Sequence, residues 1–380
     1  MNGEKDFSFY EFFAGGGMAR AGLGDRWRCV FANDIDKMKA ASYAENWGDD
    51  HLLLKDVGAL TTNELPGHVD LAWASFPCQD LSLAGSGAGI RAARSGTFWP
   101  FWGLIRDAYK EGRGPKLIVL ENVFGALTSN EGKDFAAIAS ALASSNYRFG
   151  AVVIDAVHFL PQSRPRLFVI GVHPDVEIPS QYCSPAPLTP WHPRALIEAH
   201  SKISKSAATR WLWWNLAMPS SGKKNLSELI EDNPLSVKWH TPEETKRLLA
   251  MMSEVNIRKV RQAQKLGGRI IGTIYRRTRA GIQRAEVRFD NIAGCLRTPR
   301  GGSSRQTILV VEGDDIRSRL LSQREAARLM GLPDSYILPD NYNAAYHLAG
   351  DGVAVPVVRF LAHKILEPVL QENKQRRAVA

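Results

Sequence analysis

The chain has 380 residues, of which 44% are hydrophobic and 23% are charged, a composition typical of a soluble globular protein with a full core. No apolar run approaches the roughly 20 residues of a membrane helix, and no secretion signal opens the chain, so we expect a cytoplasmic protein that binds no membrane. The net charge is +9, and residues 201–310 hold 21 Lys and Arg against 8 Asp and Glu, which favours a polyanionic partner over a merely solvated basic face.

The first 172 residues alternate short apolar runs with helical patterns. Strands are predicted at residues 7–13, 28–34, 69–76, 116–123, 148–156 and 166–172. Helices are predicted at residues 19–26, 37–47 and 135–145. Strands that alternate with helices predict a doubly wound α/β sheet.

The pattern changes after Val172. Residues 173–193 are rich in proline and read as a linker, and the chain then stays irregular and basic to about Val310. Residues 270–291 are predicted to form a β-hairpin, and Trp211, Trp213 and Trp214 are interpreted as local core of a small domain rather than stacking residues. Helical character returns at residues 321–331 and near the C-terminus.

Glycines and acids follow the first predicted strands. Gly15, Gly16 and Gly17 separate a strand from a helix, where the backbone can approach a ligand closely or simply make a tight turn. Asp34 ends the next strand about 20 residues on, a position suited to ribose hydroxyls, and Asp56 follows the next apolar stretch. Each acid alone could be a helix cap, but together they favour a nucleoside ligand.

Cys78 follows Pro77 in the loop after the strand at residues 69–76, at the edge where ligands bind open α/β sheets. The four cysteines are far apart and form no CxxC pair, so we expect neither disulfides nor a metal site. An inert buried thiol and a nucleophile remain as the two alternatives.

Two further motifs carry ionisable groups. Glu121 in "VLENV" follows an apolar strand and could cap a helix or hold a proton near neutral pH. Arg164 and Arg166 in "PQSRPRLFVIG" occupy alternate positions that lead into a strand. They either lie on one exposed face of that strand or bind a carbonyl or phosphate group.

In this order, "FAGGG", "ANDID", "KDVG", "FPCQ", "SGTFW", "ENV" and "QSRPR" resemble successive motifs of the DNA (cytosine-5) methyltransferase family. "RLLSQREAARLMGLPDSY" and "GDGVAVP" resemble its two C-terminal motifs. The resemblance implies a Rossmann-like S-adenosylmethionine methyltransferase fold with a smaller target-recognition domain, mostly irregular and β. It places the catalytic domain at residues 1–175 and the recognition domain at 176–310, with residues 311–380 returning to complete the catalytic domain.

The resemblance also implies the cofactor contacts. They fall on Phe13, Gly15, Gly17, Asp34, Ile35, Asp56, Val57, Pro77, Thr97, Asp351 and Val353. Asp34 would hold the ribose, and Asp56 the adenine amino group, with Ile35 and Val57 flanking the ring. The sequence departs from the family pattern at Met18, often a glycine, at Asp34, commonly glutamate, and at Asp351, commonly asparagine.

For catalysis, the resemblance makes Cys78 the nucleophile that adds to carbon 6 of a flipped-out cytosine. Glu121 would contact ring nitrogen 3 and the exocyclic amine, Arg164 the carbonyl oxygen, and Arg166 would brace the site. Methylation of carbon 5 and loss of Cys78 would then complete the reaction.

We expect a monomeric enzyme that binds double-stranded DNA and is associated with the nucleoid. A cognate restriction endonuclease is left open as a second partner. DNA contacts are assigned to Arg276, Arg277, Arg279, Arg284, Arg297, Arg300 and Arg305, more often through phosphate than through bases. A tRNA methyltransferase and a non-catalytic DNA-binding relative are the alternatives. The large basic region opposes the first, and the intact motifs oppose the second.

Overall fold

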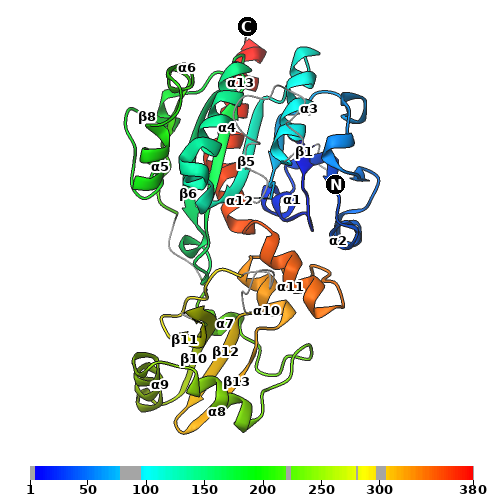
Figure 1. The fold of residues 1–380 in the computed structure, drawn as a ribbon. Coiled ribbons are helices and arrows are strands. Elements are labelled where there is room, and N and C mark those ends of the chain that lie inside the picture. The colour runs from blue at the N-terminus through cyan, green and yellow to red at the C-terminus, as the bar shows by residue number, and fades with distance from the viewer. Residues whose placement is uncertain (1–4, 78–95, 220–223, 280, 297–304, 380) are drawn as a thin grey trace. The chain divides into compact units, whose positions relative to one another are not determined.

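The computed structural model describes residues 5–77, 96–219, 224–279, 281–296 and 305–379 (Figure 1). They form two compact units. The large unit comprises residues up to 155, residues 165–219 and residues from 357 onward, and the small unit comprises residues 156–164 and 220–356. The boundaries predicted at residues 175 and 310 separate domains by function, whereas these two units are defined by packing. The functional boundaries therefore stay a prediction.

A seven-stranded sheet forms the centre of the large unit. Its strands are β1 (Phe7–Phe12), β2 (Trp27–Asp34), β3 (Leu52–Leu54), β4 (Leu71–Ala74), β5 (Leu117–Val123), β6 (Arg148–Asp155) and β7 (Pro165–Val172). Their order is β3-β2-β1-β4-β5-β7-β6, and β7 runs antiparallel to the other six strands. The predicted α/β class is therefore confirmed. Because β1 to β5 are parallel, their carboxyl ends meet at one edge of the sheet.

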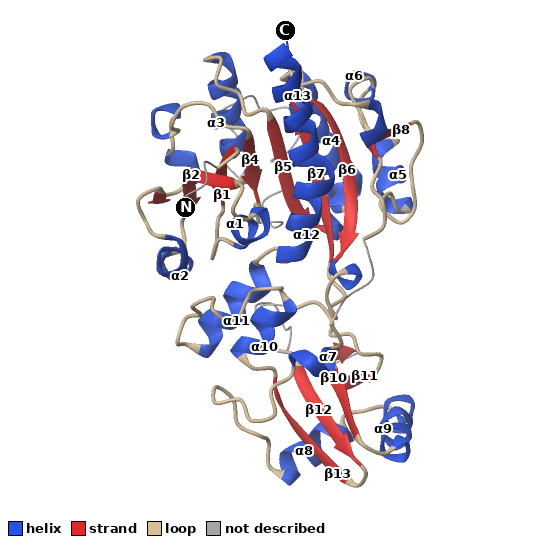
Figure 2. Ribbon diagram, turned by 180° about the vertical axis from the view of Figure 1, so that it is seen from behind, coloured by secondary structure: helices blue, strands red, loops and turns tan. Residues whose placement is uncertain are grey.

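The strands carry apolar residues on both faces, which explains why helices pack against both faces of the sheet. The helices of the large unit are α1 (Met18–Leu23), α2 (Lys37–Trp47), α3 (Phe98–Lys110), α4 (Lys133–Ser144), α5 (Arg194–His200), α6 (Lys205–Ala208), α12 (Val355–Leu361) and α13 (Glu367–Val379). Figures 1 and 2 show α3 and α4 over one face and α12 and α13 over the other. Phe12 accordingly meets Phe101 of α3 at 5.0 Å between ring centroids, whereas Trp27 donates to Glu367 of α13.

The proline-rich segment and the residues after it pack onto the large unit. Short strands β8 (Cys183–Ser184) and β9 (Trp213–Trp214) pair there, and Leu212 N–H donates to Phe149 O at 2.7 Å. Trp214 is fully buried and Trp211 packs edge-on against Phe149. The tryptophans are thus core residues as predicted, but they belong to the large unit, because the strand β6 beside them supplies their apolar partner.

The small unit contains an antiparallel sheet in the order β11 (Ile282–Arg288), β10 (Arg269–Arg279), β12 (Thr307–Glu312), β13 (Asp315–Leu320). The predicted hairpin is β10–β11. The helices of this unit are α7 (Leu226–Leu229), α8 (Pro242–Ala250), α9 (Glu254–Leu266), α10 (Gln323–Leu329) and α11 (Tyr342–Asp351). Leu248 of α8 and Val260 of α9 form a core with Ile274 and Leu309 of the sheet. No described helix combines the length and apolar character that crossing a membrane requires.

Candidate active site

The loop between β1 and α1 is held from several sides. Ala14 N–H donates to Asn33 O at 2.9 Å, and Gly17 N–H donates to Ala14 O at 2.8 Å. Gly15 and Gly17 have φ values of 56° and 75°, which favour glycine. A Cβ on Gly17 would also lie 2.4 Å from the Trp47 indole nitrogen, so Gly17 is required by both backbone conformation and space.

Asp34 connects this loop to the end of β2. Its carboxylate accepts hydrogen bonds from Gly15 N–H and Asp36 N–H, each at 2.8 Å. Each carboxylate oxygen keeps a further lone pair, so these two bonds leave acceptor capacity for a ligand. Ile35 follows with 65% of its surface exposed, and Leu54, the β3 neighbour of Asp34, is also exposed. The Asp34 carboxylate, a hydrogen-bond acceptor, thus lies beside the exposed apolar side chains of Ile35 and Leu54. Leu54 was not predicted from the sequence, because a single leucine forms no recognisable motif.

The remaining predicted cofactor residues differ in exposure. Asp56 is exposed and accepts from Gly58 N–H at 2.8 Å, capping the short helix η1 (Val57–Ala59), while Val57 itself is buried in the core. Pro77 is exposed, and the Thr97 hydroxyl is buried without a hydrogen-bond partner among the described residues. A buried hydroxyl that lacks a partner favours a missing polar ligand.

Glu121 and Arg166 form the ionic part of the site. Glu121, at the carboxyl end of β5, is 6% exposed, and its Oε1 lies 3.3 Å from Arg166 Nε of β7. The neighbouring Asn122 side chain donates to Phe76 O at 3.0 Å. The predicted "ENV" and "QSRPR" motifs therefore meet, and "ENV" also anchors the strand end that leads into "FPCQ".

Arg164 has a different environment, in the small unit. It is 1% exposed, and Nη2 donates to Gly350 O and Gly352 O at 2.7 Å each. Nη1 donates to Leu296 O at 3.2 Å. Its guanidinium therefore donates to three backbone carbonyls in two segments of the small unit, around residue 296 and at residues 350–352.

Asp351 and Val353 belong to the small unit as well. Asp351 is exposed at the end of α11, and Val353 is buried. The glycine loop belongs to the large unit, so the structure does not test the cofactor role predicted for these two residues.

Several predicted residues lie outside the described part of the chain, namely Cys78, Arg297, Arg300 and the side chain of Arg279. Arg277 and Arg284 are exposed and directly opposite each other in the β10–β11 hairpin. Arg276 is opposite the buried Ala285, and Arg305 bonds the Asn343 side chain and lies over the Tyr342 ring. Arg277 also lies 3.8 Å from Glu286. Among the hairpin arginines whose side chains are described, Arg277 and Arg284 are the exposed ones.

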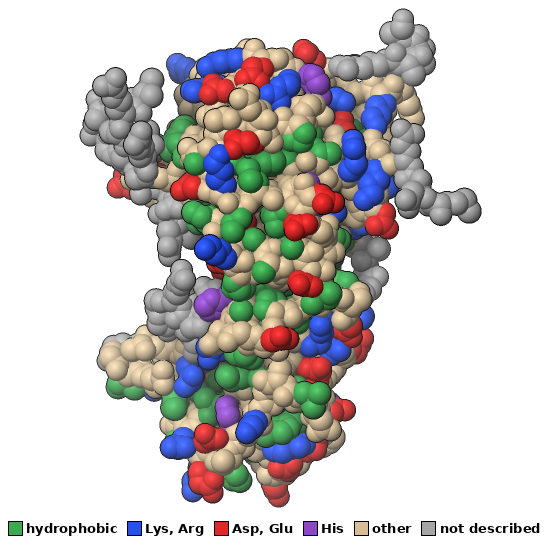
Figure 3. All heavy atoms as spheres, turned by 90° about the vertical axis from the view of Figure 1, so that its right-hand side faces the viewer, with side chains coloured by type: hydrophobic (Ala, Val, Ile, Leu, Met, Phe, Trp, Pro, Cys, Tyr) green, Lys and Arg blue, Asp and Glu red, His purple; other side chains and the backbone are tan. Residues whose placement is uncertain are grey.

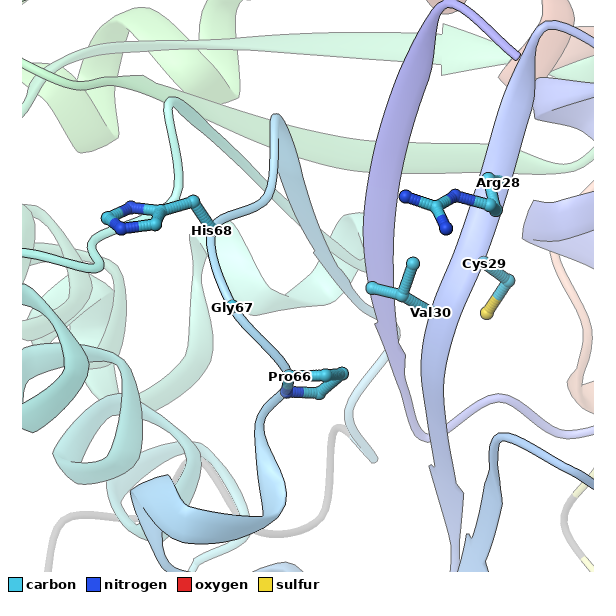
Figure 4. A pocket seen from close by; sticks show the side chains of 6 residues that line it. All are labelled: Arg28, Cys29, Val30, Pro66, Gly67 and His68. Atoms are coloured by element: carbon cyan, nitrogen blue, oxygen red, sulfur yellow. The ribbon is translucent and has the colours of Figure 1, made fainter. Parts of the chain in front are cut away.

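A cavity of about 510 Å³ lies away from this edge (Figure 4). It is lined by Arg28, Cys29 and Val30 of β2 and by residues 66–68, which precede β4. Both segments lie toward the amino ends of their strands, whereas the residues described above follow the carboxyl ends. The cavity is therefore not part of the candidate site.

Comparison with known proteins identifies the class and then the family. Among solved structures, the chain resembles the Dnmt2 methyltransferase of S. pombe, with a TM-score of 0.60 and 16% identity over 96% of this chain and 99% of that one. This likeness shows a methyltransferase fold. The C-5 cytosine-specific DNA methylase family matches residues 7–367, and the chain belongs to this family.

Curated relatives agree over nearly the whole length. The type II methyltransferase M.BsuFI of Bacillus subtilis is 26% identical over 97% of this chain and 74% of its own. M.HpaII of Haemophilus parainfluenzae is 26% identical over 96% and 91%, and M.HhaI of Haemophilus parahaemolyticus is 26% identical over 94% and 93%. The predicted membership of the cytosine-5 methyltransferase family is confirmed.

Proposed function

We propose that the chain is a sequence-specific DNA (cytosine-5) methyltransferase that acts through a covalent Cys78 adduct. One observation carries the proposal beyond family membership. Glu121 pairs with Arg166, while Asn122 beside it holds the backbone of Phe76, two residues before Cys78 in the sequence. An acid and a cation thus lie beside the residue that holds the Phe76 backbone, just before Cys78 in the sequence.

The chemistry follows from the weak nucleophilicity of carbon 5 of cytosine. Addition of the Cys78 thiolate to carbon 6 moves electrons toward carbon 5, and a proton shared between Glu121 and ring nitrogen 3 stabilises that intermediate. S-Adenosylmethionine, when bound, supplies an electrophilic methyl group on its sulfonium. Carbon 5 takes the methyl group, and loss of its proton and of Cys78 restores the aromatic ring. The base must leave the stacked duplex first, at a cost of roughly a few kcal/mol.

The geometry favours an exchange of the two predicted arginine roles. Arg166 lies beside Glu121 and is the arginine placed to contact the carbonyl oxygen of the same base. Arg164 is buried on backbone carbonyls of Gly350, Gly352 and Leu296, so it acts as the brace.

Cytosine-5 DNA methyltransferases generally use S-adenosylmethionine, and the residues of the large unit fit it. Asp34 would accept from the ribose hydroxyls, Asp56 would accept from the adenine amino group, and the exposed Ile35 would cover the ring. The buried Thr97 hydroxyl would gain the partner it lacks among the described residues. Val57 fits less well as a flanking residue because its side chain is buried in the core.

The DNA partner is supported by the charge of the small unit. Arg277 and Arg284 are directly opposite each other, and like charges in that position destabilise a hairpin. Glu286 of β11, whose Oε2 lies 3.8 Å from Arg277 Nε, offsets part of this repulsion, and a bound phosphate would offset more of it. On the face shown in Figure 3, basic and acidic side chains are interspersed, so the basic excess is not concentrated there. Phosphate contact by the hairpin is the function that this arrangement supports.

The alternatives have less support. The curated relatives are named type II methyltransferases, a name given to DNA-modifying enzymes of restriction systems, and they align over nearly the whole chain rather than over the catalytic motifs alone. A tRNA substrate and a non-catalytic role are therefore not favoured. A cognate endonuclease and a monomeric state stay predictions.

The test is nucleoside mass spectrometry on DNA and tRNA from cells that express this chain or its Cys78→Ala variant, in a host without cytosine methylation. We expect 5-methylcytosine in DNA with the wild type alone. Methylation confined to tRNA would replace the DNA proposal by the tRNA alternative. Retained DNA methylation in Cys78→Ala would refute the covalent mechanism.

A further inference from the structure

Four side chains that the proposed chemistry does not use form a connected group against the glycine loop. They are Arg20 of α1, Tyr43 and Trp47 of α2, and His51 of the loop before β3. The Trp47 indole N–H donates to Gly16 O at 3.1 Å. The Arg20 guanidinium carbon lies 5.0 Å from the Trp47 ring centroid and 5.7 Å from that of Tyr43.

The orientation of Arg20 is fixed from its other side. Its Nη1 lies 3.0 Å from the Tyr43 hydroxyl and 2.5 Å from His51 Nε2. An arginine can only donate, so His51 Nε2 must accept and the imidazole must be neutral. The contacts therefore run from His51 through Arg20 and the Trp47 ring to the backbone of Gly16.

Charged groups around His51 act in opposite directions. Burial and the Arg20 cation lower the pKa of His51 below its ordinary value, whereas Asp50 and Asp49 of its own loop raise it. From the sheet, Glu11 of β1 and Cys29 of β2 lie beyond Tyr43 and act on its hydroxyl. The neutral form that Arg20 requires is thus the one favoured at pH 7. A protonated ring would place a second cation against the guanidinium.

We propose that Trp47, oriented by Arg20 and His51, positions the glycine loop for S-adenosylmethionine, and that protonation of His51 weakens this hold and the binding of the cofactor. These are positioning residues, and the proposal rests on the proposed function. Since Trp47 both bonds Gly16 O and fills the space that a Cβ on Gly17 would need, a change at its ring acts on the loop directly.

The first experiment titrates S-adenosylmethionine into the full chain by calorimetry at pH 7.5. Trp47→Phe keeps a ring but loses the bond to Gly16 O, and we expect a three- to tenfold higher Kd. The matched control is Trp27→Phe. Trp27 lies at the amino end of β2, away from Asp34 and the glycine loop, and this variant loses the indole hydrogen bond to Glu367. It should leave Kd unchanged.

The outcomes separate the two claims. A wild-type chain that binds no S-adenosylmethionine would refute the proposed function itself. Wild-type binding with an unchanged Kd in Trp47→Phe would refute the positioning role alone. An equal loss in Trp27→Phe would also refute it, because the effect would then be general destabilisation, which thermal unfolding of both variants would reveal.

The second experiment tests His51. We expect the wild-type Kd to rise several-fold between pH 7.5 and 5.5, and His51→Gln, a neutral acceptor for Arg20, to remove most of that rise. Titration of the cofactor is common to both proteins and cancels in the comparison. An identical pH dependence in His51→Gln would overturn the role of His51.

Discussion

Glu11 lies in β1 among aromatic residues, with 1% of its surface exposed. Its Oε1 accepts from Arg20 N–H at 3.2 Å. Burial raises the pKa of this carboxyl to about 8, although the Arg20 backbone bond and cation act in the other direction. The residue is therefore protonated at neutral pH when folded, and ionised in the unfolded chain.

This buried acid makes a prediction about stability. Because the folded chain keeps a proton that the unfolded chain releases above about pH 4.5, stability contributed by neutral Glu11 is lost as pH rises toward 8. Glu11→Gln should therefore be more stable than the wild type at pH 8.5, by a few kcal/mol since one pKa unit is about 1.4 kcal/mol. The two proteins should be similar at pH 5. Urea unfolding without cofactor measures both, and parallel pH profiles would contradict the assignment.

The two arginines of "QSRPR" can be separated by experiment. Arg166→Lys should keep the thermal unfolding midpoint and lose about 10²-fold in turnover, since it removes a donor beside Glu121. Arg164→Lys should instead destabilise the chain by about 2–4 kcal/mol, because several buried carbonyls lose their donor. Methylation rates and unfolding curves of both variants give the answer. A stable but inactive Arg164→Lys would restore the assignment made from sequence.

At the scale of single residues, the sequence predicted the position of those site residues whose place follows from the order of the strands. Asp34 and Glu121 lie toward the carboxyl ends of parallel strands, so their position at the same edge of the sheet was predictable, although β1 and β4 lie between their strands. Trp47 and His51 were not, because their contacts depend on how α1 packs against α2. The same limit applies to the exchange of roles that we propose for Arg164 and Arg166, since alternation along a chain does not tell which of the two residues will be buried.

At the scale of elements, six strands of the large sheet were predictable because each is a largely buried apolar run. The three-residue strand β3 was not predicted, because it is short and its residues are only partly buried or exposed. The segment at residues 176–219 was predicted as linker and small-domain material, yet it packs on β6. Prolines and short apolar stretches give no periodicity, so only tertiary contacts reveal its place. His192 shows how closely it packs, with 2% exposure, Nδ1 accepting from Leu188 N–H at 2.7 Å, and the Trp213 ring 4.9 Å away.

His192 makes this element sensitive to acid. Burial lowers its pKa to about 4, so between pH 6.5 and 4 the unfolded chain binds a proton that the folded chain refuses. Stability should fall as the pH decreases through this range, by up to roughly 3 kcal/mol. His192→Asn, with an oxygen to accept from Leu188 N–H, should flatten that fall even if it lowers stability at pH 7. His68→Asn, at an exposed histidine, is the control, and an equal flattening there would refute the role of His192.

At the scale of the whole molecule, positive charge is distributed unevenly along the chain. The part of the chain outside residues 201–310 holds 27 basic and 31 acidic residues and is therefore close to neutral, so the excess of positive charge lies within residues 201–310. Many of the described arginines are already in ion pairs, as Arg317 is with Glu312 and Asp315. Arg277 of the hairpin also lies 3.8 Å from Glu286, a longer separation than the 3.0 Å between Arg317 and Asp315. Net charge therefore overstates the number of cations available to DNA, and the exposed arginines of the hairpin are the better guide.

The final prediction follows from that pair. If Arg277 and Arg284 each contact a phosphate, Arg277→Gln/Arg284→Gln should reduce the slope of log K against log salt by about 2, since each contact contributes about 0.9. Specific and non-specific DNA should weaken alike, and cofactor affinity should not change. Arg317→Gln, which removes an ion-paired arginine of β13, should leave the slope unaltered. A slope unchanged in the double variant would show that the hairpin does not contact phosphate, and a loss confined to one DNA sequence would assign these arginines to base contacts instead.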